Sequence, residues 1–250
     1  MLPDWTKFTL RQKIGQMIIV RASGCLFDHE IRYPAWEVSN DKLFSWLNTL
    51  NIGGVILLGG SAGEITLRTR QLQKLSNIPL FIAADIEEGV GQRFSGGTHF
   101  PPPMALGEIA KHDLKTATKL AYSMGEMIAE EALSIGINWM LAPIVDINNN
   151  PNNPVINIRS FGETPDVVSQ LAKAFIKGAK NHPILTTAKH FPGHGNTSND
   201  SHIELPVINH DSKRLNNLEL VPFKEAISLK IDSIMSAHIS VSYTHLRAHE

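Results

Sequence analysis

The part of the chain richest in side chains that can do chemistry runs from Lys189 to His202, where three histidines, one lysine and one aspartate occupy fourteen positions. Histidine can take up or release a proton near pH 7, and a neighbouring aspartate can fix which ring nitrogen carries that proton. The run 183–188 directly before this segment is apolar and β-prone. We therefore predict a buried strand that delivers Lys189 and His190 to its carboxyl end, followed by a polar loop.

Further charged side chains follow other apolar runs. Asp85 and Arg93 come after one of them, and Asp146 and Arg159 come after the next. If these runs are parallel strands, their carboxyl ends meet at one end of the sheet, where barrel enzymes carry their sites. Charged donors and acceptors without an apolar ligand pocket suit a polyhydroxylated substrate, because every hydroxyl can both donate and accept hydrogen bonds.

Positioning these residues requires strands and helices that alternate, and the hydrophobic pattern predicts such an alternation. The predicted strands are 16–21, 52–58, 79–84, 137–143, 183–188 and 232–237. The predicted helices are 10–15, 41–50, 64–76, 114–132, 166–178 and 218–229. About six β/α units in this order favour an α/β protein with a parallel sheet, an incomplete (β/α)8 TIM-type barrel. An open Rossmann or flavodoxin-like sheet is the alternative, but no strand precedes a G-x-G-x-x-G turn or a Walker loop.

Composition limits the partners. The chain has 250 residues, 42% of them hydrophobic, and a formal net charge of -1. Acidic and basic residues are interspersed, so we expect no nucleic-acid partner and no polybasic membrane contact. The first residues lack the features of a signal peptide, and no apolar run approaches the roughly 20 residues of a membrane span, so we expect a soluble protein. We expect no cofactor and no metal, and nothing in the sequence indicates the oligomeric state.

Several ordered motifs resemble those of one enzyme family. The chain reads K-H-F-P-G-H-G at 189–195, D-S-H at 200–202, P-I-V-D at 143–146 and R-S-F-G-E at 159–163. Over about residues 10–241, these motifs resemble the N-terminal domain of the family 3 glycoside hydrolases, in the branch of bacterial β-N-acetylhexosaminidases (β-N-acetylglucosaminidases). The resemblance implies a retaining glycosidase that removes terminal β-linked N-acetylglucosamine from a glycoside or muropeptide, with a role in cytoplasmic peptidoglycan recycling.

The resemblance also assigns roles to single residues. It implies that five side chains bind the hydroxyls of the sugar in the first subsite: Asp85, Arg93, Arg159, Lys189 and His190. It implies a loop dyad in which His202 is the general acid/base and Asp200 orients it. A histidine that donates one ring N–H to a carboxylate keeps the other nitrogen for proton exchange with the glycosidic oxygen.

Two departures separate the chain from the family pattern. Between Asp85 and Arg93 it lacks the interior arginine of the family's D-x-E-G-G-R-V-x-R-F element, a change that can alter sugar or leaving-group binding. The family's nucleophilic aspartate belongs to an S/T-D-D-L-x-M element, and these residues contain no such element. We therefore expect a C-terminally truncated barrel domain at 1–241, a non-native tail at 242–250 and an inactive polypeptide.

Three other functions are open. A β-glucosidase of the same family would lack the dyad that Asp200 and His202 supply. A non-catalytic remnant would bind N-acetylglucosamine without cleaving it. A metal-dependent barrel hydrolase would use the histidines at positions His190, His194, His202 and His238. Against this last function, Lys189 would lie beside the cation and the strand-end H-x-H spacing is absent.

Three nearby residues also have structural explanations. His194 lies between two glycines, and we favour a turn residue that is hydrogen-bonded to the backbone. Asp146 can orient Arg159, cap the following loop or contact the substrate. His238 follows the sixth predicted strand and can line the site or lie outside it.

Overall fold

The computed structural model describes three stretches of the chain: residues 3–197, 207–208 and 211–241. The chain forms two compact units. Unit 1 comprises 1–99 and 130–140, and unit 2 comprises 100–129 and 141–250.

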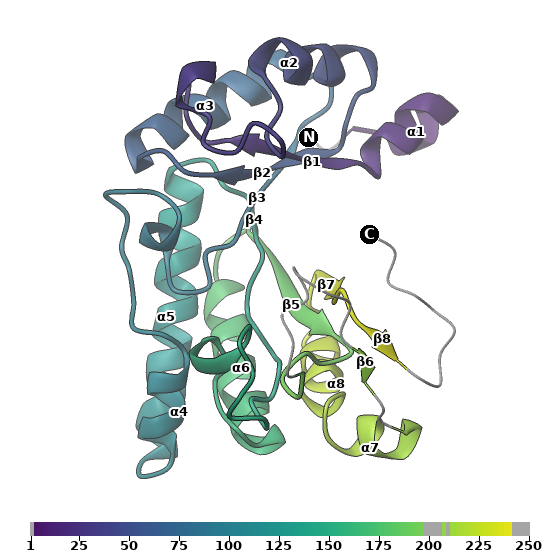
Figure 1. Cartoon of the computed structure of the whole chain (residues 1–250). Coiled ribbons are helices and arrows are strands. Elements are labelled where there is room, and N and C mark those ends of the chain that lie inside the picture. Colours follow the sequence, from purple (N-terminus) through teal and green to yellow (C-terminus); the bar gives the residue numbers. More distant parts are fainter. Residues whose placement is uncertain (1–2, 198–206, 209–210, 242–250) are drawn as a thin grey trace. The chain divides into compact units, whose positions relative to one another are not determined.

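Within its described residues, unit 1 is built on four parallel strands that lie side by side in chain order (Figure 1). They are β1 (Ile19–Ser23), β2 (Gly54–Leu58), β3 (Phe81–Ala84) and β4 (Trp139–Met140). Val55 on β2 lies opposite Ile82 on β3. Both side chains are completely buried, as expected for parallel strands that are covered on both faces.

The helices of unit 1 supply the apolar cover for these strands. They are α1 (Leu10–Gln16), α2 (Asn40–Thr49) and α3 (Ala62–Leu75), with short 3-10 helices at Trp5–Lys7, Asp28–Glu30 and Val90–Gln92. Leu43 and Leu47 of α2 and Ile65 and Leu72 of α3 are completely buried. Spacings of four residues in α2 and seven in α3 place each pair on one helix face, which explains why these faces turn inward.

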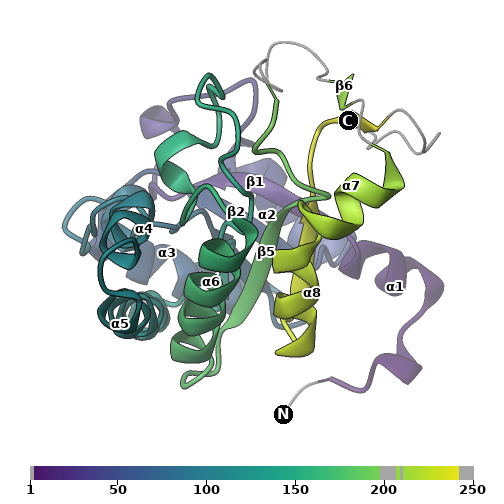
Figure 2. The same cartoon turned by 90° about the horizontal axis from the view of Figure 1, so that it is seen from below.

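Unit 2 contains two parallel strand pairs, β5 (Leu185–Phe191) with β7 (Ser233–Ser236) and β6 (Val207–Ile208) with β8 (Ser240–Val241). Its helices are α4 (Met104–Ala110), α6 (Pro165–Ala179), α7 (Ser212–Asn217) and α8 (Val221–Ser228), with a 3-10 helix at Asn157–Arg159. The long helix α5 (Leu114–Ser134) begins in unit 2 and ends in unit 1. Figure 2 shows α6 and α8 side by side along β5. No helix in the described part of the chain has the length and apolar character that crossing a membrane requires.

Helices α5 and α6 approach each other backbone to backbone at two glycines. A Cβ atom on Gly125 would lie 2.2 Å from the Phe175 carbonyl oxygen, and one on Gly178 would lie 2.0 Å from that of Tyr122. Any side chain would clash with main-chain atoms at these positions. The two glycines therefore set the spacing of α5 and α6.

The predicted alternation of strands and helices is confirmed, and the boundaries differ for local reasons. The strand predicted at 16–21 begins only at Ile19, because Gln16 still belongs to α1. The strand predicted at 137–143 is reduced to β4, and Pro143, which has no N–H for a strand ladder, follows it. Strand β5 runs beyond its predicted end, so that Lys189 and His190 lie within it. Helices α4 and α7 were not predicted, since each is too short for a clear period.

Helix α3 begins with a capping box that offers a direct test of the local structure. Ser61 Oγ accepts a hydrogen bond from Glu64 N at 3.2 Å, and Glu64 Oε2 accepts one from Ser61 N at 3.0 Å. Replacing Ser61 by alanine should lower the free energy of unfolding by about 1 kcal/mol, because an N–H of the first turn loses its partner. Urea denaturation followed by circular dichroism measures this loss. Ser45→Ala, at an exposed position inside α2, is the matched control and should cause no comparable loss.

Candidate active site

Strand β5 brings Lys189 and His190 to the carboxyl end of the sheet in unit 2. The segment 186–189 is buried, and Asp232 Oδ2 accepts hydrogen bonds from both Thr186 N and Thr186 Oγ1 at 2.9 Å. Lys189 is only 1% exposed. Its carbonyl oxygen accepts a hydrogen bond from Val145 N at 2.8 Å, so the chain around Val145 runs beside the end of β5.

The Asp146 carboxylate is the centre of this region and is completely buried. Its Oδ2 accepts hydrogen bonds from His190 N at 3.0 Å and His190 Nδ1 at 2.7 Å, and its Oδ1 accepts one from His194 N at 2.7 Å. An ionised carboxylate can only accept, so Nδ1 of His190 carries a proton and, in the neutral ring, Nε2 is an acceptor. The His190 side chain is 17% exposed and so can contact a ligand.

Two pKa values reflect this packing. Burial by itself would raise the pKa of Asp146, but the charge of His190 and the hydrogen bonds from His190 and His194 outweigh it and hold this pKa below its usual value. Burial lowers the pKa of His194, because a buried imidazolium loses its hydration. At pH 7, Asp146 is therefore ionised and His194 is neutral.

His194 is a buried residue of the turn after β5. It is 2% exposed, and its Nδ1 lies 2.7 Å from Thr197 Oγ1. Its carbonyl oxygen accepts a hydrogen bond from Asn153 Nδ2 at 2.8 Å. The expected turn position is found, and the Thr197 hydroxyl is one partner of the ring. For Asp146, the structure adds a role that was not predicted, because its carboxylate accepts hydrogen bonds from His190 and from the His194 N–H.

Arg159 is positioned by the chain segment that precedes it. Asn153 Oδ1 accepts hydrogen bonds from the N–H groups of Val155 at 2.9 Å and Ile156 at 2.7 Å, which fixes the entry into the short helix. Asn157 then adopts a left-handed backbone with φ 43, which asparagine tolerates better than most residues. Arg159 Nη1 donates to Val155 O at 2.9 Å, and the guanidinium is near enough for its charge to act on His194.

Unit 1 holds the other two predicted sugar-binding residues. Asp85 follows β3 directly, and the chain then turns back so that Arg93 Nε donates to the Asp85 carbonyl oxygen at 3.1 Å. Gly89, with φ 105, lies in this turn, and the completely buried Phe94 anchors its end. The structure therefore brings Asp85 and Arg93 together. Asp200 and His202 lie outside the described residues.

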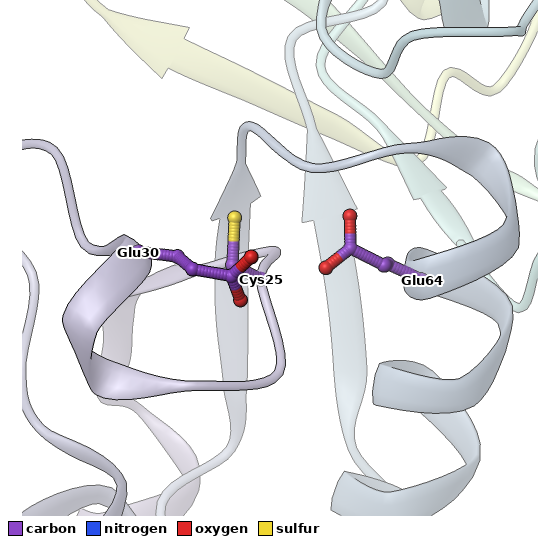
Figure 3. Close-up of side chains that lie close together, drawn as sticks. All are labelled: Cys25, Glu30 and Glu64. Carbon is purple, nitrogen blue, oxygen red and sulfur yellow. The ribbon is translucent and has the colours of Figure 1, made fainter.

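A second polar group in unit 1 was not predicted from any sequence motif. Among the described residues, one set of three possible metal ligands has its ligand atoms within 4.8 Å of one another: Cys25, Glu30 and Glu64 (Figure 3). None of the histidines proposed for a metal-dependent hydrolase belongs to it. The Glu64 carboxylate already caps α3, and the guanidinium groups of Arg32 and Arg93 line the same cavity. We therefore interpret these side chains as the wall of a cleft and not as a cation site.

Comparison with known families places the chain in a class of enzymes. The model of the glycosyl hydrolase family 3 N-terminal domain matches residues 9–247. The chain belongs to glycoside hydrolase family 3.

Two curated relatives make the relationship more specific. The chain is 40% identical to the β-hexosaminidase A of Pseudoalteromonas piscicida over 210 residues, which cover 79% of this chain and 34% of that protein. It is 40% identical to the β-hexosaminidase of Tolumonas auensis over 199 residues, which cover 78% of this chain and 58% of that protein. The chain thus spans less than two thirds of the length of either relative.

Solved structures agree with the family. A family 3 β-N-acetylglucosaminidase from Paenibacillus superimposes with a TM-score of 0.82 at 34% identity, covering 96% of this chain and 44% of that one. NagZ from Neisseria gonorrhoeae, in complex with N-trifluoroacetyl-D-glucosamine, superimposes with a TM-score of 0.79 at 29% identity, covering 91% and 66%. The expected fold class is confirmed: the chain has the fold of an incomplete (β/α)8 TIM-type barrel.

The two lowered pKa values predict how stability depends on pH. A group whose pKa is lower in the folded protein contributes stability above its unfolded pKa and loses it as the pH falls through the folded value. For His194 the loss should begin near the ordinary value of 6.5, and for Asp146 near 3.8. Urea denaturation between pH 7.5 and 2 measures both steps.

The variants assign each step to its residue. His194→Gln should flatten the upper step, and Asp146→Asn should reduce the lower one, because neither new side chain titrates. Part of the lower step should stay in Asp146→Asn, since the pKa values of Asp4 and Asp113 are lowered too. His112→Gln, at an exposed position, is the control and should keep the wild-type profile. An unchanged upper step in His194→Gln would contradict the assignment to this histidine.

Proposed function

We propose that this chain carries the sugar-binding half of a β-N-acetylhexosaminidase, which removes terminal β-linked N-acetylglucosamine with retention of configuration. The relatives that are 40% identical are β-hexosaminidases, and NagZ binds an N-acylated glucosamine analogue. The single observation that carries the proposal is the buried Asp146 carboxylate, which orients His190 at the end of β5. This geometry supports a histidine that accepts a hydrogen bond from a sugar hydroxyl through Nε2.

The remaining binding groups complement the hydroxyls of a sugar. Arg93 and Arg159 can donate hydrogen bonds, and the Asp85 carboxylate can accept them. Lys189 adds a positive charge at the same strand end as His190. Hydrogen bonds to charged groups are stronger than neutral ones, so each of these side chains favours a polyhydroxylated ligand over an apolar one.

The proposed chemistry needs two further groups. His202 would protonate the glycosidic oxygen while Asp200 orients its ring, and a carboxylate nucleophile would attack the anomeric carbon from the opposite side. Water would then hydrolyse the glycosyl-enzyme, with the histidine acting as the base. The cytoplasmic location and the role in peptidoglycan recycling stay predictions from the resemblance.

A second candidate is a family 3 protein that recognises glucosides. A β-glucoside phosphorylase, BglX, superimposes with a TM-score of 0.80 at 29% identity. The two candidates differ in the ligand they select, since only a hexosaminidase site should prefer the 2-acetamido sugar over glucose.

Calorimetric titration of the chain tests the proposal. N-acetylglucosamine should bind more tightly than glucose, and Arg159→Ala should weaken binding by roughly 10-fold or more, because a hydrogen bond from a charged group is lost. Arg70→Ala, at an exposed position on α3, is the matched control and should leave the affinity unchanged. Equal affinity for glucose would favour the glucoside candidate, and no binding of either sugar would overturn both.

Catalysis gives a separate prediction. These 250 residues contain no S/T-D-D-L-x-M element, so the polypeptide should bind the sugar but release no 4-nitrophenol from 4-nitrophenyl N-acetyl-β-D-glucosaminide. The β-hexosaminidase of Tolumonas auensis serves as the positive control in the same assay. Turnover by the 250-residue polypeptide would contradict this prediction without affecting the proposed specificity.

A further inference from the structure

Unit 1 contains a cleft beyond the carboxyl ends of its first two strands. Two adjoining cavities, of about 210 and 390 Å³, share the same five residues, and together we call them the β1–β2 cleft. The shared residues are Cys25, Glu30, Arg32, Gly59 and Arg93. Arg93 is also one of the predicted sugar-binding residues, so the cleft adjoins that part of the proposed site.

The loop that carries Tyr33 and Glu37 forms one wall of the cleft, and contacts with strand β1 hold it in place. Arg21 on β1 lies 3.5 Å from Glu37 Oε1, and the Glu37 side chain is 3% exposed. The Arg21 guanidinium also lies over two rings of the loop, 5.6 Å from the centroid of Tyr33 and 5.4 Å from that of Trp36. Contacts of this kind hold Tyr33 in place before any ligand arrives, which lowers the entropy cost of binding.

Tyr33 combines this anchoring with exposure. It lines the smaller cavity and remains 56% exposed. An exposed and anchored aromatic ring offers an apolar face, and the axial C–H bonds of a sugar ring can pack on such a face. Glu30 and Arg32 line the same cavity. Their charged groups offer an acceptor and a donor for ring hydroxyls. Arg32 makes no hydrogen bond or ion pair within the described residues.

We propose that the β1–β2 cleft is a second sugar subsite, which receives the ring linked to the sugar held by Arg93. Tyr33 packs against this second ring, and Arg32 and Glu30 bind its hydroxyls. The larger cavity falls within the 300–1,000 Å³ that is usual for ligand pockets. This inference rests on the proposed function, because it needs a first ring at Arg93.

The first test compares one ring with two. Calorimetric titration should show that N,N′-diacetylchitobiose binds at least 10-fold more tightly than N-acetylglucosamine. Tyr33→Ala and Arg32→Ala should each remove most of this difference and leave the affinity for the monosaccharide unchanged. Tyr33→Phe keeps the ring and should keep the difference, and Arg70→Ala is the control for loss of a surface charge.

The second test uses the single cysteine of the chain. Cys25 lines both cavities, so its alkylation by iodoacetamide reports on this cleft. Saturating N,N′-diacetylchitobiose should slow the alkylation several-fold, and saturating N-acetylglucosamine should slow it much less. This readout needs no variant and does not depend on how a substitution affects folding.

The outcomes separate this inference from the proposed function. If neither sugar binds, the proposed function fails, and the second subsite fails with it. If the monosaccharide binds but the disaccharide binds no more tightly and leaves Cys25 unprotected, the second subsite is overturned and the proposed function stands. Tighter disaccharide binding that Tyr33→Ala leaves intact would place the second ring elsewhere and also overturn the inference.

Discussion

The site in unit 2 depends on one buried charge. The Asp146 carboxylate has lost its water and is stabilised by three N–H donors, two from His190 and one from His194. These bonds join the chain that follows β4 to the turn that follows β5. The same carboxylate therefore closes the turn and sets the tautomer of His190, so folding and the proposed sugar binding would use a single group.

In unit 1, a loop is held by a different kind of interaction. Arg21 connects its strand to the loop through an ion pair with Glu37 and through the faces of two aromatic rings. A guanidinium can do both at once because it is planar and keeps its charge. These contacts fasten the loop beside the β1–β2 cleft to strand β1. Without such contacts, an exposed loop has low local stability.

The parts of this structure that local patterns determine could be predicted from the sequence, and those that depend on distant contacts could not. Runs such as 52–58 and 183–188 identified β2 and β5 because a buried parallel strand is apolar throughout, but the polar motif at 189–195 hid the last residues of β5. The partnership of Asp146 with His190 joins residues 44 positions apart, and no local signal encodes it. The residues of the β1–β2 cleft also come from separate loops. Residues of the same types occur on many polar surfaces, so the sequence does not single them out. Asp200 and His202 remain predictions.

The glycines between α5 and α6 determine the spacing of these two helices because they have no Cβ atom. With no side chain between the backbones, the helices meet at van der Waals distance, and a larger residue at Gly125 or Gly178 would have to displace main chain. The exposed faces of the same helices carry no such constraint. A scan of all substitutions in this region should therefore find its least tolerant positions at residues that touch neither ligand nor water, with freely variable positions one turn away.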